Sequence, residues 1–216
     1  RIAVYYNTSN TYTGDISAAG GAGAGVAPAG AAGTIYLKKD EDALGSLIIN
    51  NSGRNGAETL IEPSFLNVNL TYINISGFGR LSWNASSPRF NFTIAGINIK
   101  SNGYLTHPSH TTEHRVSLNL TVGNLTIESG GLINLTGKGY VEDSGPGPGA
   151  NGEGLGEGGG AGYGGKGGDG SGGRIGGSPY GSIILPTDIG SGGGGGHGVA
   201  NSGGTGGGAL FLNVTG

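Results

Sequence analysis

The residues of this chain best suited to chemistry are asparagines followed two positions later by serine or threonine. Ten of the eighteen asparagines stand in this Asn-x-Ser/Thr pattern, the acceptor signal for N-linked glycosylation. Such an excess predicts an extracellular or cell-surface protein that carries N-linked glycans. The candidate acceptors are Asn7, Asn50, Asn69, Asn74, Asn84, Asn91, Asn119, Asn124, Asn134 and Asn213.

A second explanation covers part of this pattern. Polar faces of stacked strands favour Asn and Thr, and asparagines in equivalent positions can form a hydrogen-bonded ladder along the stack. Asn67, Asn91 and Asn119 stand in such equivalent positions, and Asn67 lacks the following Ser/Thr. The ladder explains Asn67 but not the overall excess of acceptor signals.

Two groups of residues have side chains that bind metals. His107, His110 and His114, with Glu113, have spacings that would suit zinc on a helical turn. Pro108 interrupts the first step, however, and the segment has the composition of a loop between strands. The acidic run 40–42 offers oxygen ligands for calcium, but a solvated turn is the favoured explanation. His197 has no evident partner, so we expect no metal and no cofactor.

Catalytic constellations are missing from the sequence. Glycoside hydrolysis needs two carboxyl groups close together, and the only acids in residues 64–136 are Glu113 and Glu128, at unrelated positions of the repeat described below. Gly165-Lys166-Gly167 lacks the hydroxyl residue and the strand–helix context of a phosphate-binding loop. We therefore expect no enzymatic activity.

The elements that would position these residues follow a ten-residue pattern. It covers residues 66–75, 90–99 and 118–127, so its copies start 24 and 28 residues apart. Apolar residues occupy every second position, as in a strand, and the phase slips by one at 71–72, 95–96 and 123–124, as at a corner. The predicted core residues are Leu66, Val68, Leu70, Phe90, Phe92, Ile94, Leu118, Leu120 and Val122.

Recurring strand–corner–strand units predict an all-β solenoid, a right-handed parallel β-helix with three short strands per coil. A third strand is expected around Leu81, Leu105 and Ile133, and a glycine in fixed register (Gly79, Gly103, Gly131) predicts a turn with positive φ. The alternative is an antiparallel sandwich with regularly spaced strands.

Residues 145–208 differ in composition, because half of them are glycine. We expect residues 1–144 to form β-helix coils, residues 145–208 to be a long glycine-rich insertion, and residues 209–216 to start the next coil. The insertion is either a disordered loop or a set of packed extended chains whose glycines let backbones touch. Tyr163 and the run 180–189 are anchors that a pure linker would lack.

Composition excludes other partners. Charged residues make up 12% of the 216 residues and the net charge is −3, so there is no basic face for nucleic acid. No apolar run is long enough to span a membrane. Ile2, Val4, Leu212 and Val214 extend the core pattern towards both ends. We therefore expect a piece of a longer protein that stacks on further coils or on copies of itself.

Several strings resemble a known family. They are the residues 1–6, 14–21, 32–38, 163–168, 179–182 and 186–193. These strings are similar to the glycine-rich repeat modules of very large secreted pectin-lyase-like β-helix proteins. The resemblance implies a β-helix fold and secretion, and it implies nothing about chemistry.

The sequence thus predicts a structural extracellular glycoprotein. In this hypothesis a stiff β-helical rod, coated with N-linked sugars, forms part of a filament, a surface hair or a matrix. The alternative function is a carbohydrate- or surface-binding adhesin that uses the glycine-rich insertion. Exposed aromatic residues on the insertion would favour that alternative.

Overall fold

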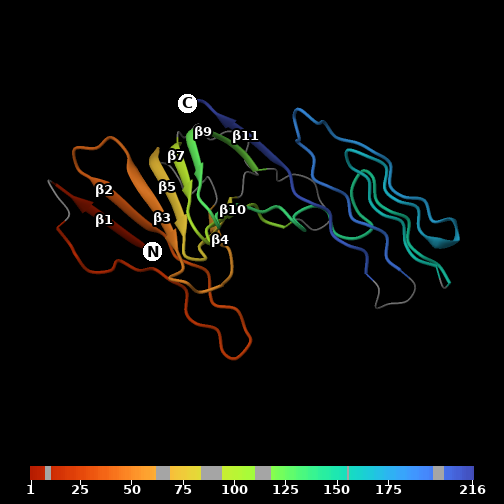
Figure 1. The fold of residues 1–216 in the computed structure, drawn as a ribbon, viewed down its shortest axis with the longest axis horizontal. Helices are drawn as coiled ribbons and strands as arrows, with labels where there is room; N and C mark the ends of the chain where they lie inside the picture. Colours follow the sequence, from red (N-terminus) through yellow and green to blue (C-terminus); the bar gives the residue numbers. More distant parts are fainter. Residues whose placement is uncertain (8–10, 62–68, 84–93, 110–117, 155, 197–201) are drawn as a thin grey trace. The chain divides into compact units, whose positions relative to one another are not determined.

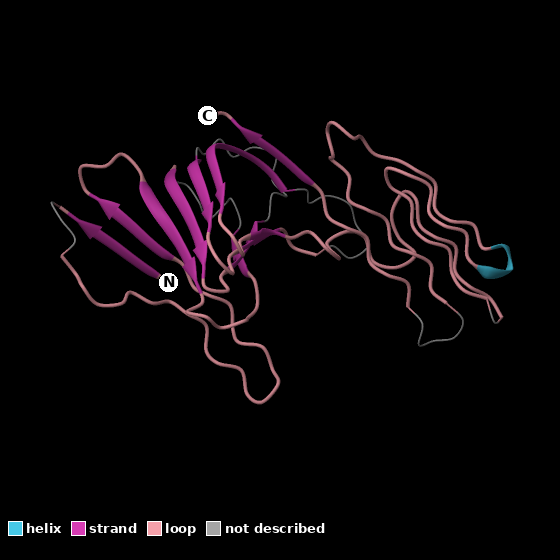
Figure 2. Cartoon of the chain, viewed as in Figure 1, coloured by secondary structure: helices cyan, strands magenta, loops and turns pink. Residues whose placement is uncertain are grey.

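The structure is a computed structural model, and it describes residues 1–7, 11–61, 69–83, 94–109, 118–154, 156–196 and 202–216. The chain forms two compact units. Unit 1 contains Arg1–Thr106, Leu120–Asn134 and Leu212–Gly216, and unit 2 contains His107–Asn119 and Leu135–Phe211. Figure 1 labels the strands along the chain, and Figure 2 shows that strands and loops account for nearly all of it.

The strands belong to two sheets. One has seven strands in the order β1-β2-β3-β5-β7-β9-β11, and the other has four in the order β10-β8-β6-β4. The bounds are β1 Ile2–Tyr6, β2 Ile35–Lys39, β3 Gly45–Asn50, β4 Thr59–Ile61, β5 Leu70–Ser76, β6 Arg80–Trp83, β7 Ile94–Ile99, β8 Tyr104–Thr106, β9 Leu118–Ile127, β10 Leu132–Ile133 and β11 Leu210–Val214. A short 3₁₀ turn, η2 (Ser171–Gly173), lies in unit 2.

From β3 to β10 the chain alternates between the two sheets. Each strand pairs in parallel with the strand two elements later, from β3 to β9 in one sheet and from β4 to β10 in the other. The third strands expected around Leu81, Leu105 and Ile133 are β6, β8 and β10. The prediction of an all-β chain with parallel sheets is confirmed.

The core follows the predicted register. Leu70 pairs with Ile94, and Ile94 pairs with Val122; all three side chains are buried. Leu118 and Leu120 are buried as well. The other predicted core residues, Leu66, Val68, Phe90 and Phe92, lie outside the described residues.

The predicted phase slip is present in β5. Leu70 is buried, the next two side chains are not, and Ile73 and Ile75 are buried again. Tyr72, at the slip, pairs with Gly96 of β7, and its ring occupies the space that a side chain at Gly96 would need. An outward-facing tyrosine thus covers the glycine of the neighbouring strand, which explains how the slip is accommodated there.

Of the recurring glycines, Gly53 has the predicted positive φ, at 80°, whereas Gly79, Gly103 and Gly131 have a different role. Positive φ occurs one residue earlier, at Phe78, Asn102 and Gly130, and not at Gly79, Gly103 or Gly131. A Cβ at those three glycines would lie less than 3.0 Å from the carbonyl oxygens of Ile49, Ile75 and Ile99. Close approach between backbones, and not a left-handed conformation, therefore requires glycine in this register.

The first strands depart from the all-parallel pattern. β1 and β2 are parallel, but β2 and β3 are antiparallel, with Ile35 opposite Ile48 and Tyr36 opposite Leu47. Directly opposite residues share a face, so Ile35 lies on the face away from Leu47. Ile2 pairs with Ile35 and is half-buried on that same face. Val4, which pairs with Leu37, is half-buried on the same face, so both residues lie on the face away from Leu47.

Unit 2 consists of extended segments joined by backbone hydrogen bonds, drawn side by side as loops in Figure 2. The segment around Gly193 bonds to three others: Gly193 accepts from Asp143 and donates to Gly204, and Gly194 donates to Gly159. A strand in a sheet has at most two neighbours, so this is a bundle. It matches the packed arrangement, one of the two that the sequence allowed.

Glycine spacing explains the bundle. A Cβ would lie less than 3.0 Å from a backbone oxygen at pairs of glycines three residues apart: Gly149 and Gly152, Gly159 and Gly162, Gly167 and Gly170, and Gly203 and Gly206. An extended polyproline-II-like chain has three residues per turn, so every third residue meets the same neighbour. Only glycine fits at those contacts.

Candidate functional site

Five of the ten candidate acceptor asparagines are exposed. Asn119 illustrates why, because it lies in β9 between the buried Leu118 and Leu120 and therefore points outward. Asn69 immediately precedes β5 and is also exposed. The exposed acceptors are Asn7, Asn69, Asn119, Asn124 and Asn213.

Three others are half-buried: Asn50, Asn74 and Asn134. The Asn50 side-chain oxygen accepts a 2.7 Å hydrogen bond from the amide of Ser52. The Asn74 oxygen accepts a 2.9 Å bond from the side-chain nitrogen of Asn98 on β7. These two carboxamides already take part in the fold. Asn84 and Asn91 lie outside the described residues.

The ladder expected at Asn67, Asn91 and Asn119 stays a prediction, and the described residues contain another asparagine pair. Asn67 and Asn91 are outside the described residues, and Asn119 is the exposed member of that set. The observed pair is Asn74 and Asn98, which are register partners on β5 and β7.

Some of the candidate metal ligands lie in the described part of the chain. His107 is fully buried, its Nδ1 lies 2.8 Å from the carbonyl oxygen of Pro108, and its ring packs against Gly208. His110, Glu113, His114 and His197 lie outside the described residues. The acidic run 40–42 is an exposed turn in which Glu41 pairs with Lys39. Among the described residues no three His, Cys, Asp or Glu side chains are grouped to hold a metal.

Sequence reasoning missed a buried asparagine. The Asn51 side-chain oxygen accepts from the Gly20 amide at 2.8 Å, and its nitrogen donates to the carbonyls of Gly30 and Arg54 at 3.1 and 2.7 Å. One carboxamide thus ties three segments of unit 1 together. Its neighbour Asn50 belongs to the acceptor pattern, and nothing in the sequence separates the two roles.

Sequence reasoning also missed a hollow in unit 2. It has a volume of about 300 Å³ and is lined by Tyr163, Gly164, Pro179, Tyr180, Gly181, Ser182 and Ile183. The rings of Tyr163 and Tyr180 meet edge to face, with centroids 5.1 Å apart and planes at 89°. The sequence identified Tyr163 and the run 180–189 as anchors, but it did not predict that Tyr163 and Tyr180 are in contact.

Both tyrosine hydroxyls are bonded within the protein. Tyr163 donates to the Asp188 carbonyl at 3.0 Å, and Tyr180 donates to the Ile189 carbonyl at 2.5 Å. Ser191 donates to the Tyr180 oxygen at 2.8 Å. Burial raises the pKa of Tyr163, and the charge of Asp188 raises it further. Burial also raises the pKa of Tyr180, so both rings stay neutral at physiological pH.

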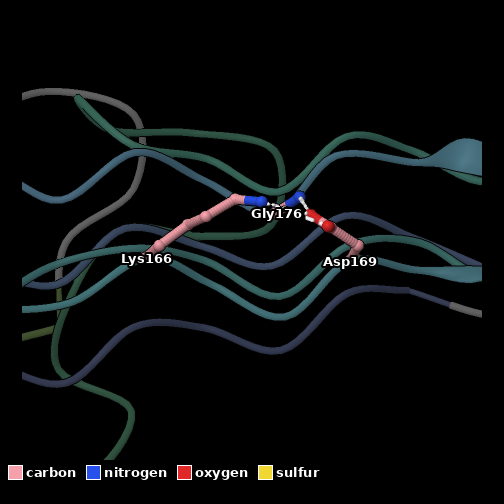
Figure 3. A network of polar contacts seen from close by, with 3 residues as sticks. All are labelled: Lys166, Asp169 and Gly176. Atoms are coloured by element: carbon pink, nitrogen blue, oxygen red, sulfur yellow. Dashed lines mark hydrogen bonds and ion pairs between the residues drawn. The ribbon is translucent and has the colours of Figure 1, made fainter.

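A polar network joins two segments elsewhere in unit 2 (Figure 3). Asp169 accepts a 2.8 Å bond from Lys166 and a 2.8 Å bond from the Gly176 amide. The Lys166 side chain, first, and then the Gly176 amide hold the pKa of Asp169 below its ordinary value. This network links the side chains of Lys166 and Asp169 to the backbone of a neighbouring segment.

No family model, curated protein or solved structure matches this chain. In the described ranges, no helix has the length and apolar character needed to cross a membrane.

Proposed function

We propose that this chain is part of a structural extracellular glycoprotein, a stiff rod built as a right-handed parallel β-helix. The observation that carries this proposal is the repeated parallel pairing of successive strands in each of the two sheets. Strands β3 to β10 alternate between two sheets, and each lies beside its counterpart from the previous turn of the chain. Stacking of equivalent strands is how a solenoid buries apolar faces that no single coil can bury alone.

The corners support the same arrangement. The turns that end at Gly79, Gly103 and Gly131 each close with a hydrogen bond from the glycine amide to the carbonyl three residues earlier, at 2.7–2.9 Å. Successive corners are joined, because the Tyr104 amide donates to the Gly79 carbonyl and the Leu132 amide to the Gly103 carbonyl, at 2.9 and 3.0 Å. A repeated corner stacked on itself favours coils over an antiparallel sandwich.

The rod would carry N-linked sugars on its outward side chains. Asn119 and Asn124 are exposed on β9, where the same strand buries Leu118, Leu120 and Val122. A sugar there projects away from the core, so a glycan coat is compatible with the stack. Such a coat would keep a weakly charged rod hydrated and would resist lateral aggregation.

We propose further coils, or copies of the same protein, as partners at the ends of the stack. β1 and β11 are the edge strands of the seven-stranded sheet, and an edge strand presents unpaired backbone groups to another chain. The function is mechanical, located in a filament, a surface hair or a matrix, and no catalytic role is part of it.

A density map of the assembly taken from its own source tests this proposal. We expect three-strand coils advancing by about 4.8 Å per coil along the rod, right-handed, with sugar density on outward asparagines. Strands that run alternately up and down between β3 and β10, or an unstacked monomer, would contradict the rod.

A further inference from the structure

The hollow in unit 2 has the size of a small ligand site. Its volume of about 300 Å³ is at the lower end of the range for ligand pockets. All seven lining residues belong to the described part of the chain, and none carries a charge. A ligand held there must therefore be small and neutral, because no lining group would neutralise a charge.

The two tyrosine rings form a rigid aromatic corner, because their planes are perpendicular and only one ring can offer its face to a ligand. Hydrogen bonds from the Tyr163 and Tyr180 hydroxyls to backbone carbonyls fix the rings at their polar tips, and the edge-to-face contact fixes them to each other. Gly181 contributes because its φ of 80° turns the chain, and a Cβ there would lie less than 3.0 Å from the Tyr163 ring. A fixed aromatic ring binds flat apolar surfaces on its face with little loss of side-chain entropy.

Polar groups at the hollow retain hydrogen-bonding capacity. Among the described residues, the amides of Gly164 and Gly181 donate no hydrogen bond. The Ser182 hydroxyl oxygen accepts from the amides of Ile184 and Leu185 at 3.4 and 3.1 Å, which leaves its own proton to donate. A site that combines an aromatic ring face with a few free donors suits a ligand that has an apolar face and oxygen acceptors at its edge.

We propose that this hollow binds one neutral pyranose ring of a carbohydrate. The C–H face of the sugar would lie on the face of one tyrosine ring and contact Ile183, and its hydroxyl oxygens would accept from Ser182 and the free amides. Uronic acids are disfavoured because no cation lines the site and Asp188 lies beside Tyr163. The proposal goes beyond the rod and gives the alternative function, carbohydrate binding, a defined location.

Saturation-transfer NMR on the full chain produced in bacteria tests the proposal, because such protein carries no N-linked sugar of its own and the method works for monomers and assemblies. The probes are the methyl glycosides of mannose, glucose, galactose and N-acetylglucosamine, with glucuronic acid as the charged comparison. We expect transfer to the ring protons of at least one neutral glycoside and weaker transfer to glucuronic acid.

The exposed side chains supply a matched pair of variants. Ile183 lines the hollow and is 93% exposed, whereas its neighbour Ile184 is 83% exposed and does not line it. Neither change should affect folding. Ile183→Ala should weaken binding about fivefold, through lost apolar contact, and Ile184→Ala should leave it unchanged. Tyr163→Ala should abolish it.

Three outcomes would overturn the inference. One is the absence of transfer to every neutral glycoside. Another is an equal loss of affinity in Ile183→Ala and Ile184→Ala. The last is binding of a proline-rich peptide at the hollow when no sugar binds. None of these outcomes tests the proposed coils of unit 1, so the sugar site can fail while the proposed rod remains valid.

Discussion

The side-chain nitrogen of Asn98 donates a 2.9 Å hydrogen bond to the side-chain oxygen of Asn74 on the adjacent strand. The two residues are register partners on β7 and β5. Asn74 also belongs to an Asn-Ile-Ser acceptor signal. The Asn74 carboxamide thus holds two adjacent strands together and is also a candidate acceptor for a sugar.

Removing the rung should lower stability. Asn74→Ala leaves the Asn98 amide without its acceptor, and we expect a loss of about 0.5–1.5 kcal/mol in the free energy of unfolding. Urea unfolding of protein made without glycans measures it. Asn124→Ala, at an exposed acceptor position, is the control and should change stability by less than about 0.5 kcal/mol. Equal losses in both variants would show that the Asn74 bond contributes nothing.

Sugar occupancy should follow exposure. In protein from its own source we expect N-linked glycans on Asn69 and Asn119, which are exposed, and lower occupancy on Asn50 and Asn74, whose side-chain oxygens accept hydrogen bonds in the fold. Intact-glycopeptide mass spectrometry gives the occupancy of each site. Unmodified peptides at every acceptor would contradict both glycosylation and secretion.

Replacing Gly103 should destabilise the fold mainly because a Cβ would collide with the neighbouring backbone, and not because of the backbone φ angle. Gly103→Ala places a Cβ against the Ile75 carbonyl oxygen, so we expect destabilisation at the upper end for overpacking, about 3 kcal/mol or more. Gly53→Ala, at φ 80° with open space around it, should cost about 1–2 kcal/mol. Denaturant midpoints of the two variants decide it, and a larger loss for Gly53→Ala would reverse our interpretation.

The glycine-rich unit should behave as folded protein. Hydrogen–deuterium exchange should show protection at amides such as Gly162 and Gly177, which donate to the carbonyls of Gly147 and Gly160 at 2.9 and 2.8 Å. Gly177→Ala places a Cβ less than 3.0 Å from the Gly147 oxygen and should abolish that protection. Gly168→Ala, with nothing within 4 Å of its Cβ, should preserve it. Complete exchange of the wild type within the dead time would identify a disordered loop.

Acidification should release the network of Asp169. Its pKa is lowered from the ordinary value of 3.8, so its contribution to stability is present above that value and is lost as the pH falls through the lower, folded-state pKa. An NMR titration of the Asp169 carboxyl should give a pKa below 3.8. In Lys166→Ala the pKa should rise, because the largest cause of the shift is removed, whereas Lys100→Ala should not change it.

The repeat was predictable because burial acts on every second residue. Alternation in residues 70–76 and 94–99 is enough to predict the strands, the slip and the matching of Leu70 with Ile94, which are register partners in the fold. The role of the recurring glycines was not predictable in this way. A glycine needed for φ and a glycine needed for space look identical in one sequence, and only the position of the Ile75 carbonyl beside Gly103 separates them.

The hollow was harder to predict from the sequence than the repeat. Tyr163 and Tyr180 were recognisable as anchors, but their contact depends on how the glycine segments between them pack, and those segments carry few side chains to set a register. The antiparallel step between β2 and β3 was also missed. The turn 40–44 joins them without the Asn-Gly signal of a tight hairpin.

The antiparallel pairing of β2 with β3 makes the two edges of the seven-stranded sheet different. β1 and β2 point against the five strands that follow, and the hydrogen bonds from Leu118 to Ala209 and from Thr215 to Val122 show that β11 runs parallel to β9. If copies join through β11 of one and β1 of the next, that seam is antiparallel, whereas every seam from β3 to β11 is parallel. Antiparallel ladders space their hydrogen bonds unevenly and parallel ladders evenly. A filament assembled in this way would carry two antiparallel seams per copy, one at the junction and one between β2 and β3, and each would recur at intervals set by the length of a single subunit.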